Sequence, residues 1–266
     1  MRSKVHPLLA SSAILVLAVL YAPMLAVAFF SVNASRYGLV WKGFTLQWYA
    51  RLLENDYILR AGWNSLVLAV ISTVIATVLG TMMAMGIARF PWPRWTRGFL
   101  DFMVYLPVVS PDIIFAVAVI VAFRMLRTVW TVFEPGLLNM ILAHVTFQIA
   151  FVALVVRSRL AIMGPTLEEA ARDLGASSWY VFRRVTLPLL APGIFAGAML
   201  AFTLSLDDFV ISFFTAGPRS TTLPIFIYAS VRRGLTPEIH ALSTLIFLVT
   251  VMLVIGLESL TRYRKE

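Results

Sequence analysis

Residues 166–188 read TLEEAARDLGASSWYVFRRVTLP and lie between two long apolar stretches of the chain. Thr166 and Glu169, three positions apart, predict a capping box at the start of a helix. Gly175 predicts the end of that helix, because glycine adopts the left-handed conformation that closes a helix without strain. One stripe of the predicted helix is apolar and follows an i, i+3, i+4, i+7 spacing: Leu167, Ala170, Ala171 and Leu174. Its other faces carry Glu168, Glu169, Arg172 and Asp173.

A second short helix is predicted directly after the first. Ser177 can cap it, aromatic residues follow, and Pro188 is expected to end it. The two helices could rest on lipid headgroups, but the alanines of the stripe bury little area and the acidic faces suit an anionic membrane surface poorly. Small residues instead allow another protein surface to approach closely. We therefore interpret residues 164–188 as a loop that docks a partner protein.

The composition indicates that this loop belongs to a membrane protein. Hydrophobic residues make up 60% of the 266 positions and charged residues 13%, whereas a soluble domain carries about 25% charged residues. Five uncharged stretches are long enough to span a bilayer: Leu8–Val32, Ala61–Ala88, Pro135–Val156, Val185–Leu206 and Ile239–Leu257. Gly98–Phe123 is a sixth candidate, although it contains Asp101 and Asp112 and is interrupted by Pro107 and Pro111. The sequence predicts an all-α membrane protein with six transmembrane helices.

The charges predict how the spans are oriented. The net charge is +9, and the basic residues lie at the ends of apolar stretches, so we interpret them as topology determinants and not as a nucleic-acid surface. Placing the N-terminus inside puts the larger share of Lys and Arg in the cytoplasm, which predicts that both termini are cytoplasmic. The first apolar stretch is longer than the roughly 7–15 residues of a signal-peptide core, so we expect it to be a retained anchor. With no cysteine, the chain has no disulfide framework and no thiolate metal site.

The predicted organisation is a single membrane domain with short additions. Residues 1–60 form the first span and a periplasmic segment, residues 61–260 form a core of five spans, and residues 261–266 form a cytoplasmic tail. Within the periplasmic segment, Thr45 is expected to cap a short interfacial helix that begins near Leu46 and carries Trp48.

Carboxylates inside spans need a physical reason, because each costs several kcal/mol unless it is paired or hydrated. Asp112 follows a proline interruption, and a broken helix at membrane depth is tolerated mainly where it lines a cavity. Asp207 and Asp208 are expected in the outer part of the fifth span. Together the three acids predict an electronegative path suited to cations, although each one taken alone could instead be held by hydrogen bonds.

Other polar residues within spans are expected to be structural. His144, Gln148 and Asn139 form a polar stripe on the fourth span and are expected to make hydrogen bonds between helices. Asp101 is expected either to be solvated at the inner interface or to pair with Arg97.

The loop also resembles a known family motif. Glu169-Ala170-Ala171, Gly175, Val185 and Leu187-Pro188 match the E-A-A-x3-G-x9-I-x-L-P loop of type I ABC importer permeases, with Val185 in place of the usual isoleucine. The resemblance implies a coupling helix that docks on a nucleotide-binding subunit, with Glu168 and Asp173 also on that helix. The chain has no phosphate-binding loop of the G-x-x-x-x-G-K-[ST] type, so ATP and Mg²⁺ are expected in a separate ATPase, and the chain itself is expected to be a transport subunit and not an enzyme.

The similarity extends to one subfamily. Four segments resemble the second permease subunit of spermidine/putrescine importers: residues 43–49, 110–112, 204–210 and 223–228. That resemblance implies that Asp112, Asp207 and Asp208 contact a polycation, that Trp48 contributes to the path, and that Glu169 acts in coupling. It also implies that the chain lies in the bacterial inner membrane and has four kinds of partner: a homologous first permease subunit, two ATPase subunits, a periplasmic polyamine-binding protein and the lipid bilayer.

Other functions remain open on the sequence alone. The same machinery could import an amino-acid-derived cation, thiamine or ferric iron. A self-sufficient secondary transporter would be indicated by inverted repeats, and none is apparent. An intramembrane enzyme would use Asp112, Asp207 and His144 as acid–base groups.

Overall fold

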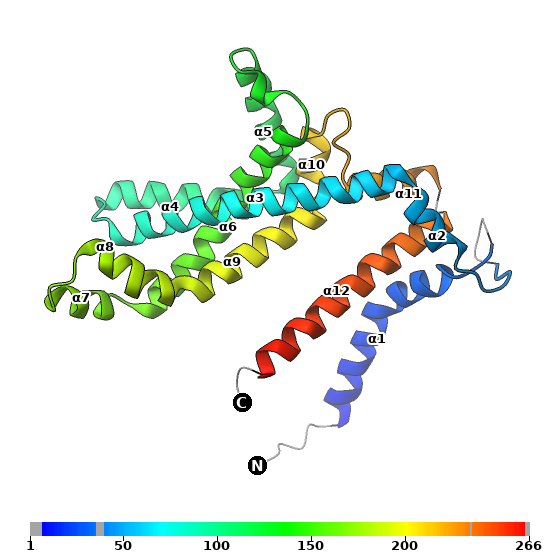
Figure 1. Cartoon of the computed structure of the whole chain (residues 1–266), viewed down its shortest axis with the longest axis horizontal. Coiled ribbons are helices and arrows are strands. Elements are labelled where there is room, and N and C mark those ends of the chain that lie inside the picture. The colour runs from blue at the N-terminus through cyan, green and yellow to red at the C-terminus, as the bar shows by residue number, and fades with distance from the viewer. Residues whose placement is uncertain (1–6, 36–39, 235, 264–266) are drawn as a thin grey trace. The chain divides into compact units, whose positions relative to one another are not determined.

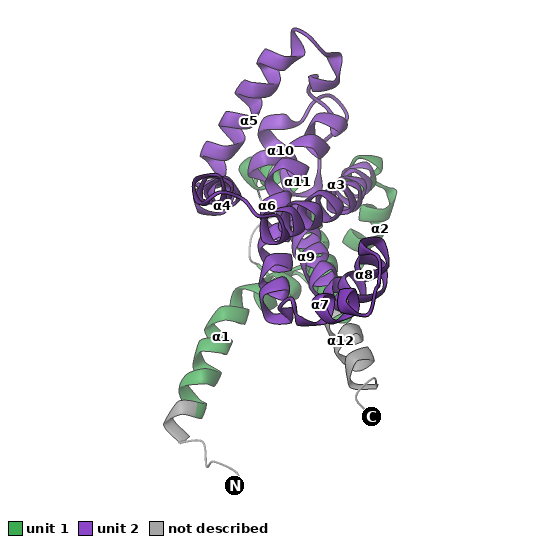
Figure 2. Cartoon of the chain, turned by 90° about the vertical axis from the view of Figure 1, so that its left-hand side faces the viewer, with its two compact units in different colours: residues 1–59, 226–266 green, residues 60–225 purple. Residues whose placement is uncertain are grey.

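The computed structural model describes residues 7–35, 40–234 and 236–263, with side chains from Ala10 to Met252. These residues are almost entirely helical, and the β-structure among them is an isolated bridge between Asn33 and Phe44 (Figure 1). The chain forms two compact units (Figure 2). Unit 1 comprises Met1–Leu59 and Phe226–Glu266, and unit 2 comprises Arg60–Ile225.

Unit 1 is built on three helices. They are α1 (Pro7–Phe30), α2 (Gln47–Glu54) and α12 (Pro237–Tyr263), and α12 packs against both of the others. The apolar side chains of α1 are mostly exposed, as expected of a helix whose surroundings are lipid. In α2 the predicted amphipathic pattern is present, with Trp48 and Leu52 buried on one face.

Unit 2 contains the remaining helices, with α3 (Asp56–Arg89) and α11 (Leu223–Arg233) running across the boundary between the units. Its other elements are listed in chain order: α4 (Arg94–Val109), α5 (Asp112–Arg127), η1 (Thr131–Phe133), α6 (Leu137–Met163), α7 (Thr166–Asp173), α8 (Ser178–Val181), η2 (Phe182–Thr186), α9 (Leu187–Asp207) and α10 (Val210–Thr215).

The core of unit 2 is centred on α6, which packs along α9. Small residues allow the helices to approach closely. A Cβ placed on Gly80 of α3 would lie 2.8 Å from the Cβ of Val152, and one on Gly193 of α9 would lie 2.7 Å from the Cβ of Arg159. Both α3 and α9 therefore contact α6 at a glycine, where any larger residue would collide with α6.

Four helices are long and apolar enough to cross a membrane among the described residues, or five if the bent pair α4 and α5 is one span. The four are Ala10–Phe30, Asp56–Arg89, Leu137–Met163 and Ser178–Asp207, and they correspond to four of the predicted spans. Pro237–Met252 is a shorter apolar helix at the place of the last predicted span, Ile239–Leu257. The helical membrane fold is confirmed, whereas the count of six stays a prediction.

The third predicted span is not one straight helix. The axes of α4 and α5 differ by 112°, and the break falls at Ser110 and Pro111 (Figure 1). Pro107 lies inside α4 and does not end it. Pro111 ends the helical geometry because its ring disfavours the helical conformation of the residue before it, and Ser110 is accordingly extended.

Pro188 does not stop the second loop helix, contrary to the prediction. Residues 178–207 are continuously helical, passing from α8 through the π-helical turn η2 into α9. A π turn already departs from regular α-helical hydrogen bonding, and proline is tolerated in the first turn of a helix because its missing N–H is not needed there. Pro188 occupies that position in α9.

Candidate functional site: the docking loop and the acidic corner

The docking loop, residues 164–188, contains the predicted helix with a different beginning. No capping box forms, because Thr166 is the first residue of α7 and Pro165 is its N-cap. The Pro165 carbonyl instead accepts the backbone N–H groups of Glu168 and Glu169, each at 3.0 Å. Gly164 has φ of +64° and turns the chain directly before Pro165. The helix therefore begins at Thr166, the residue that was predicted to cap it.

The end of α7 agrees with the prediction. Gly175 has φ of +82°, its N–H donates to the carbonyl of Arg172, and the next N–H, of Ala176, donates to the carbonyl of Ala171. These two bonds form a Schellman motif, in which glycine is favoured. Ser177 then caps α8 as predicted, since its side chain accepts the N–H of Tyr180.

One face of α7 is open. Leu174 is 89% exposed and Leu167 is 53% exposed, so the apolar stripe has no cover from the described part of the chain. Several loop residues predicted to act in coupling are exposed beside it: Glu169, Ala170, Asp173, Gly175, Leu187 and Pro188. Ala171 is half-buried. A short helix with exposed leucines and a small residue between them is a surface suited to a protein partner.

Glu168 differs from its neighbours, because its side chain is buried inside unit 2. Its Oε1 accepts a hydrogen bond from Arg89 Nη2 at 3.1 Å and another from Thr186 Oγ1 at 2.9 Å. Arg89 Nη2 also donates to the Gly164 carbonyl at 3.2 Å. One carboxylate thus joins α3, the docking loop and the π turn before α9, and Glu168 is not free to contact a partner directly.

The three predicted acids lie in unit 2, where two helix breaks bring them together. Asp112 is the first residue of α5, Asp207 is the last residue of α9, and both are exposed. The carboxylates of Asp112 and Asp208 lie near enough to Asp207 to interact with it electrostatically. We call Asp112, Asp207 and Asp208 the acidic corner. Negative charge gathered at two interrupted helices is an arrangement that binds cations.

Asp208 is held by the protein in a way that Asp207 is not. Its Oδ2 accepts the N–H of Ser212 at 2.8 Å, and its Oδ1 lies 3.3 Å from the N–H of Ile211. Asp208 therefore caps the N-terminus of α10, where a carboxylate is favoured by the free N–H groups.

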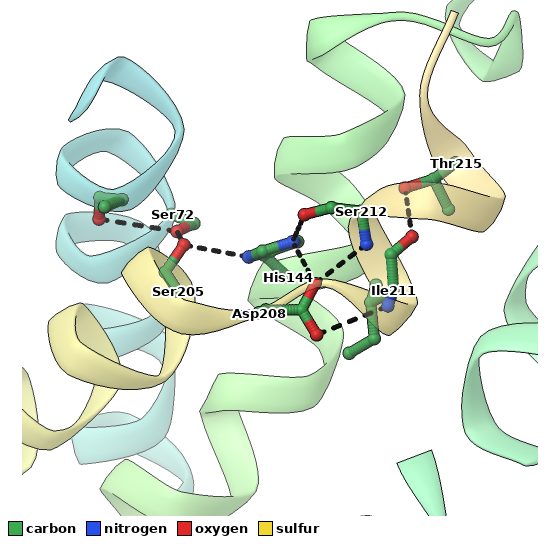
Figure 3. A network of polar contacts seen from close by, with 8 residues as sticks. Ser72, His144, Ser205, Asp208, Ile211, Ser212 and Thr215 are labelled. Atoms are coloured by element: carbon green, nitrogen blue, oxygen red, sulfur yellow. Dashed lines mark hydrogen bonds and ion pairs between the residues drawn. The ribbon is translucent and has the colours of Figure 1, made fainter. Parts of the chain in front are cut away.

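A buried histidine completes this arrangement (Figure 3). His144, on α6, is 2% exposed; its Nδ1 lies 2.8 Å from Ser205 Oγ, and its Nε2 lies 3.0 Å from Ser212 Oγ and 3.3 Å from Asp208 Oδ2. Ser205 is also 3.3 Å from Ser72 Oγ of α3. The structure confirms that His144 makes hydrogen bonds between helices, and it identifies the partners, which the sequence did not predict.

The other polar residues of α6 behave differently. Gln148 and Asn139 are also buried, but Gln148 Nε2 and Oε1 and Asn139 Oδ1 have no hydrogen-bond partner among the described residues. Asp101 pairs with Arg157 of α6 at 2.7 Å and not with Arg97, so that part of the prediction is wrong, and its side chain is 32% exposed. Arg157 is 56 positions away, and no local spacing connects the two.

Trp48 belongs to unit 1, and its side chain is occupied there. It is 2% exposed, and its Nε1 donates to the Asn33 carbonyl at 2.8 Å. The Asn33 side chain in turn accepts the N–H groups of Ser35 and Lys42. Trp48 thus holds α2 to the segment after α1, which explains its burial without a substrate.

Comparison with known proteins connects both regions to transport. Residues 76–263 match the family described as binding-protein-dependent transport system inner membrane component. The chain is 44% identical over 229 residues to the putrescine transport system permease protein PotI of Escherichia coli K12, covering 85% of this chain and 81% of that protein. It is 37% identical over 245 residues to the spermidine/putrescine transport system permease protein PotC of the same organism, covering 92% and 90%.

Solved structures share the fold. A bacterial ABC transporter that imports the acidic polysaccharide alginate gives a TM-score of 0.74 at 21% identity, covering 97% of this chain and 94% of that one. The methionine ABC transporter MetNI gives 0.59 at 20% identity, covering 77% and 94%. The family match and the two curated relatives show that the chain is a membrane-spanning permease subunit of an ABC importer, a transport subunit whose ATPase is a separate chain. The chain belongs to the family of binding-protein-dependent transport system inner membrane components.

Proposed function

We propose that this permease subunit translocates polyamines such as putrescine and spermidine. The observation that carries the proposal is the acidic corner, where Asp112 and Asp207 come from different helices and present exposed carboxylates near one another. An extended polyamine carries two or more ammonium groups, and separate carboxylates at two interrupted helices offer each of two ammonium groups a partner of opposite charge. The names of PotI and PotC, which specify putrescine and spermidine, support the same cargo.

The proposed assembly assigns a partner to each exposed region. The open face of α7, with Glu169 and Asp173 beside it, docks an ATPase subunit on the cytoplasmic side, and both termini lie on that side. A homologous permease subunit pairs with this chain, and two ATPase subunits bind the pair. A periplasmic polyamine-binding protein delivers the cation to the acidic corner at the outer side.

The proposed cycle follows from that assembly. ATP binding closes the ATPases, moves α7 and opens the permease outward, so that the cation can leave the capture protein. ATP hydrolysis then reopens the permease inward. The ATPase-coupling residues have two tasks. Glu168 passes the motion to α3 and α9, and the docked surface is formed by Glu169, Ala170, Ala171, Asp173, Gly175, Leu187 and Pro188. ATP with Mg²⁺ is bound by the partner.

Uptake by the purified complex in proteoliposomes tests this function. Labelled putrescine and spermidine should accumulate only when ATP, both permeases, the ATPase and the capture protein are present. Asp207→Asn should lower uptake, whereas the exposed loop variant Arg172→Gln, remote from the acidic corner, should leave the ratio of the two amines unchanged. Uptake of thiamine or ferric iron in place of both amines would reject the proposed cargo but keep the permease role. Uptake by this chain alone without ATP would reject the ABC mechanism.

A further inference from the structure

We propose that the two adjacent aspartates of the acidic corner have different functions. In this proposal, which rests on the proposed cation cargo, Asp207 and Asp112 contact the ammonium groups, whereas Asp208 is a positioning residue held by His144. The two aspartates are chemically identical neighbours in the sequence. Only their contacts separate them.

The Asp208 carboxylate is largely occupied by groups of the protein itself. Each of its oxygens is directed at a backbone N–H of the first turn of α10, and Oδ2 also faces His144 Nε2. Its side chain is 12% exposed. A carboxylate accepts only a few hydrogen bonds, and those of Asp208 are directed at the protein. Little of it remains to be offered to a cation.

His144 holds Asp208 in place. The His144 ring joins three elements, because it contacts Ser205 near the end of α9, Ser212 in α10 and Asp208 between them (Figure 3). A proton on Nε2 satisfies this set: Nε2–H faces the Ser212 hydroxyl at 3.0 Å and the Asp208 carboxylate at 3.3 Å, and Nδ1 faces the Ser205 hydroxyl. Because His144 is buried within α6, it holds the junction between α9 and α10 at one position on the core.

Asp207 has different surroundings from Asp208. It ends α9 immediately before the extended residue Asp208, and its side chain is exposed. The negative end of the α9 dipole adds to its charge. The junction held by His144 therefore determines where Asp207 lies relative to Asp112. Loss of His144, or of the cap that Asp208 makes on α10, should lower the uptake of every cargo by the same factor. Loss of the Asp207 charge should instead lower uptake by a factor that depends on the charge of the cargo.

Substitution pairs test this division. Asparagine caps a helix about as well as aspartate but lacks its charge. Asp208→Asn keeps one oxygen that can accept the N–H of Ser212 and should keep uptake within about twofold, whereas Asp208→Ala, which leaves both N–H groups without this acceptor, should lower it about fivefold or more. Asp207→Asn and Asp207→Ala should lower uptake by similar factors, about tenfold, because the lost contact is to a charged group.

The ratio of spermidine to putrescine uptake provides a second measurement. Asp207→Asn should change this ratio, because the two amines differ in charge. His144→Phe, which keeps a ring of similar shape without its nitrogens, should lower uptake of both amines equally. Co-purification with the ATPase identifies any variant that fails to fold. Among the variants that assemble, uptake by Asp207→Asn and by Asp208→Asn then decides whether the two aspartates have different functions.

A cargo-independent measurement separates this inference from the proposed function. The chain contains no cysteine, so Asp207→Cys and Asp208→Cys can be labelled directly in membranes with a cationic thiol reagent. Asp207→Cys should react about tenfold faster, since only the exposed thiol is accessible to a charged reagent. Equal labelling rates, or an Asp208→Asn variant that loses uptake and shifts the amine ratio as Asp207→Asn does, would overturn the inference. Absence of amine uptake by the unaltered complex, with unequal labelling, would reject only the cargo.

Discussion

Replacing Glu168 by alanine should separate ATP hydrolysis from transport. Glu168 Oε1 accepts hydrogen bonds from Arg89 at 3.1 Å and from Thr186 at 2.9 Å, and the carboxylate is 8% exposed. These bonds connect the docking loop to α3 and to the turn before α9. If α7 transmits the motion of the ATPase, this carboxylate is the contact through which both helices receive it.

The size of the effect follows from the contacts that are lost. A hydrogen bond to a charged group contributes about 1.5–3 kcal/mol, but the Arg89 side chain is 30% exposed, so its share is reduced by solvent screening. The Thr186 hydroxyl is buried and would be left without its acceptor, at a cost of about 1–3 kcal/mol. The attachment of α7 should weaken by about 2–4 kcal/mol in total, which is a factor of about 30 or more in the population of the attached arrangement.

The assay measures ATP hydrolysis and amine uptake on the same proteoliposomes. Glu168→Ala should still bind the ATPase and support hydrolysis, because the exposed face of α7 is unchanged, while uptake per ATP falls by about tenfold or more. Glu169→Gln is the matched control, since Glu169 is exposed on the same helix and its loss should weaken ATPase binding with uptake per ATP retained. An unchanged uptake per ATP in Glu168→Ala, or a loss of ATPase binding equal to that of Glu169→Gln, would refute the reasoning.

Three further predictions concern positions where the structure sets a steric or hydrogen-bonding limit. Gly175→Ala places a side chain at φ of +82° and should cost about 1 kcal/mol at the end of α7, seen as weaker ATPase binding, whereas Ser178→Ala, at an exposed position of the same loop, should not alter it. Gly80→Ala brings a Cβ to 2.8 Å from Val152 Cβ and should destabilise the protein by about 1–3 kcal/mol, measured as a lower melting temperature. Gly86→Ala, whose new Cβ would meet no atom within 4 Å, should not lower the melting temperature, and equal melting temperatures of the two variants would contradict the close packing. Trp48→Phe removes the hydrogen bond to Asn33 and should cost about 1 kcal/mol of stability without changing the amine ratio, and a changed ratio would instead place Trp48 on the substrate path.

Local signals in the sequence predicted local features well. Gly175 closes α7 and Ser177 caps α8, because each acts on backbone groups within a few residues of itself. The apolar stretches predicted the helices that can span a membrane, since the cost of unsatisfied backbone in lipid depends on composition and length alone. The capping box failed because a competing acceptor, the Pro165 carbonyl, was already in position.

The sequence by itself therefore determined the membrane class, the short helix of residues 166–173 and the presence of acids beside a broken span. It could not distinguish Glu168 from Glu169, or Asp207 from Asp208, because each pair has the same chemistry and the same neighbourhood in the chain. The tertiary structure decided both. Glu168 meets Arg89, which lies 79 positions earlier, and Asp208 meets His144, which lies 64 positions earlier. Adjacent residues point in different directions, and which of them is buried depends on partners that only folding brings together.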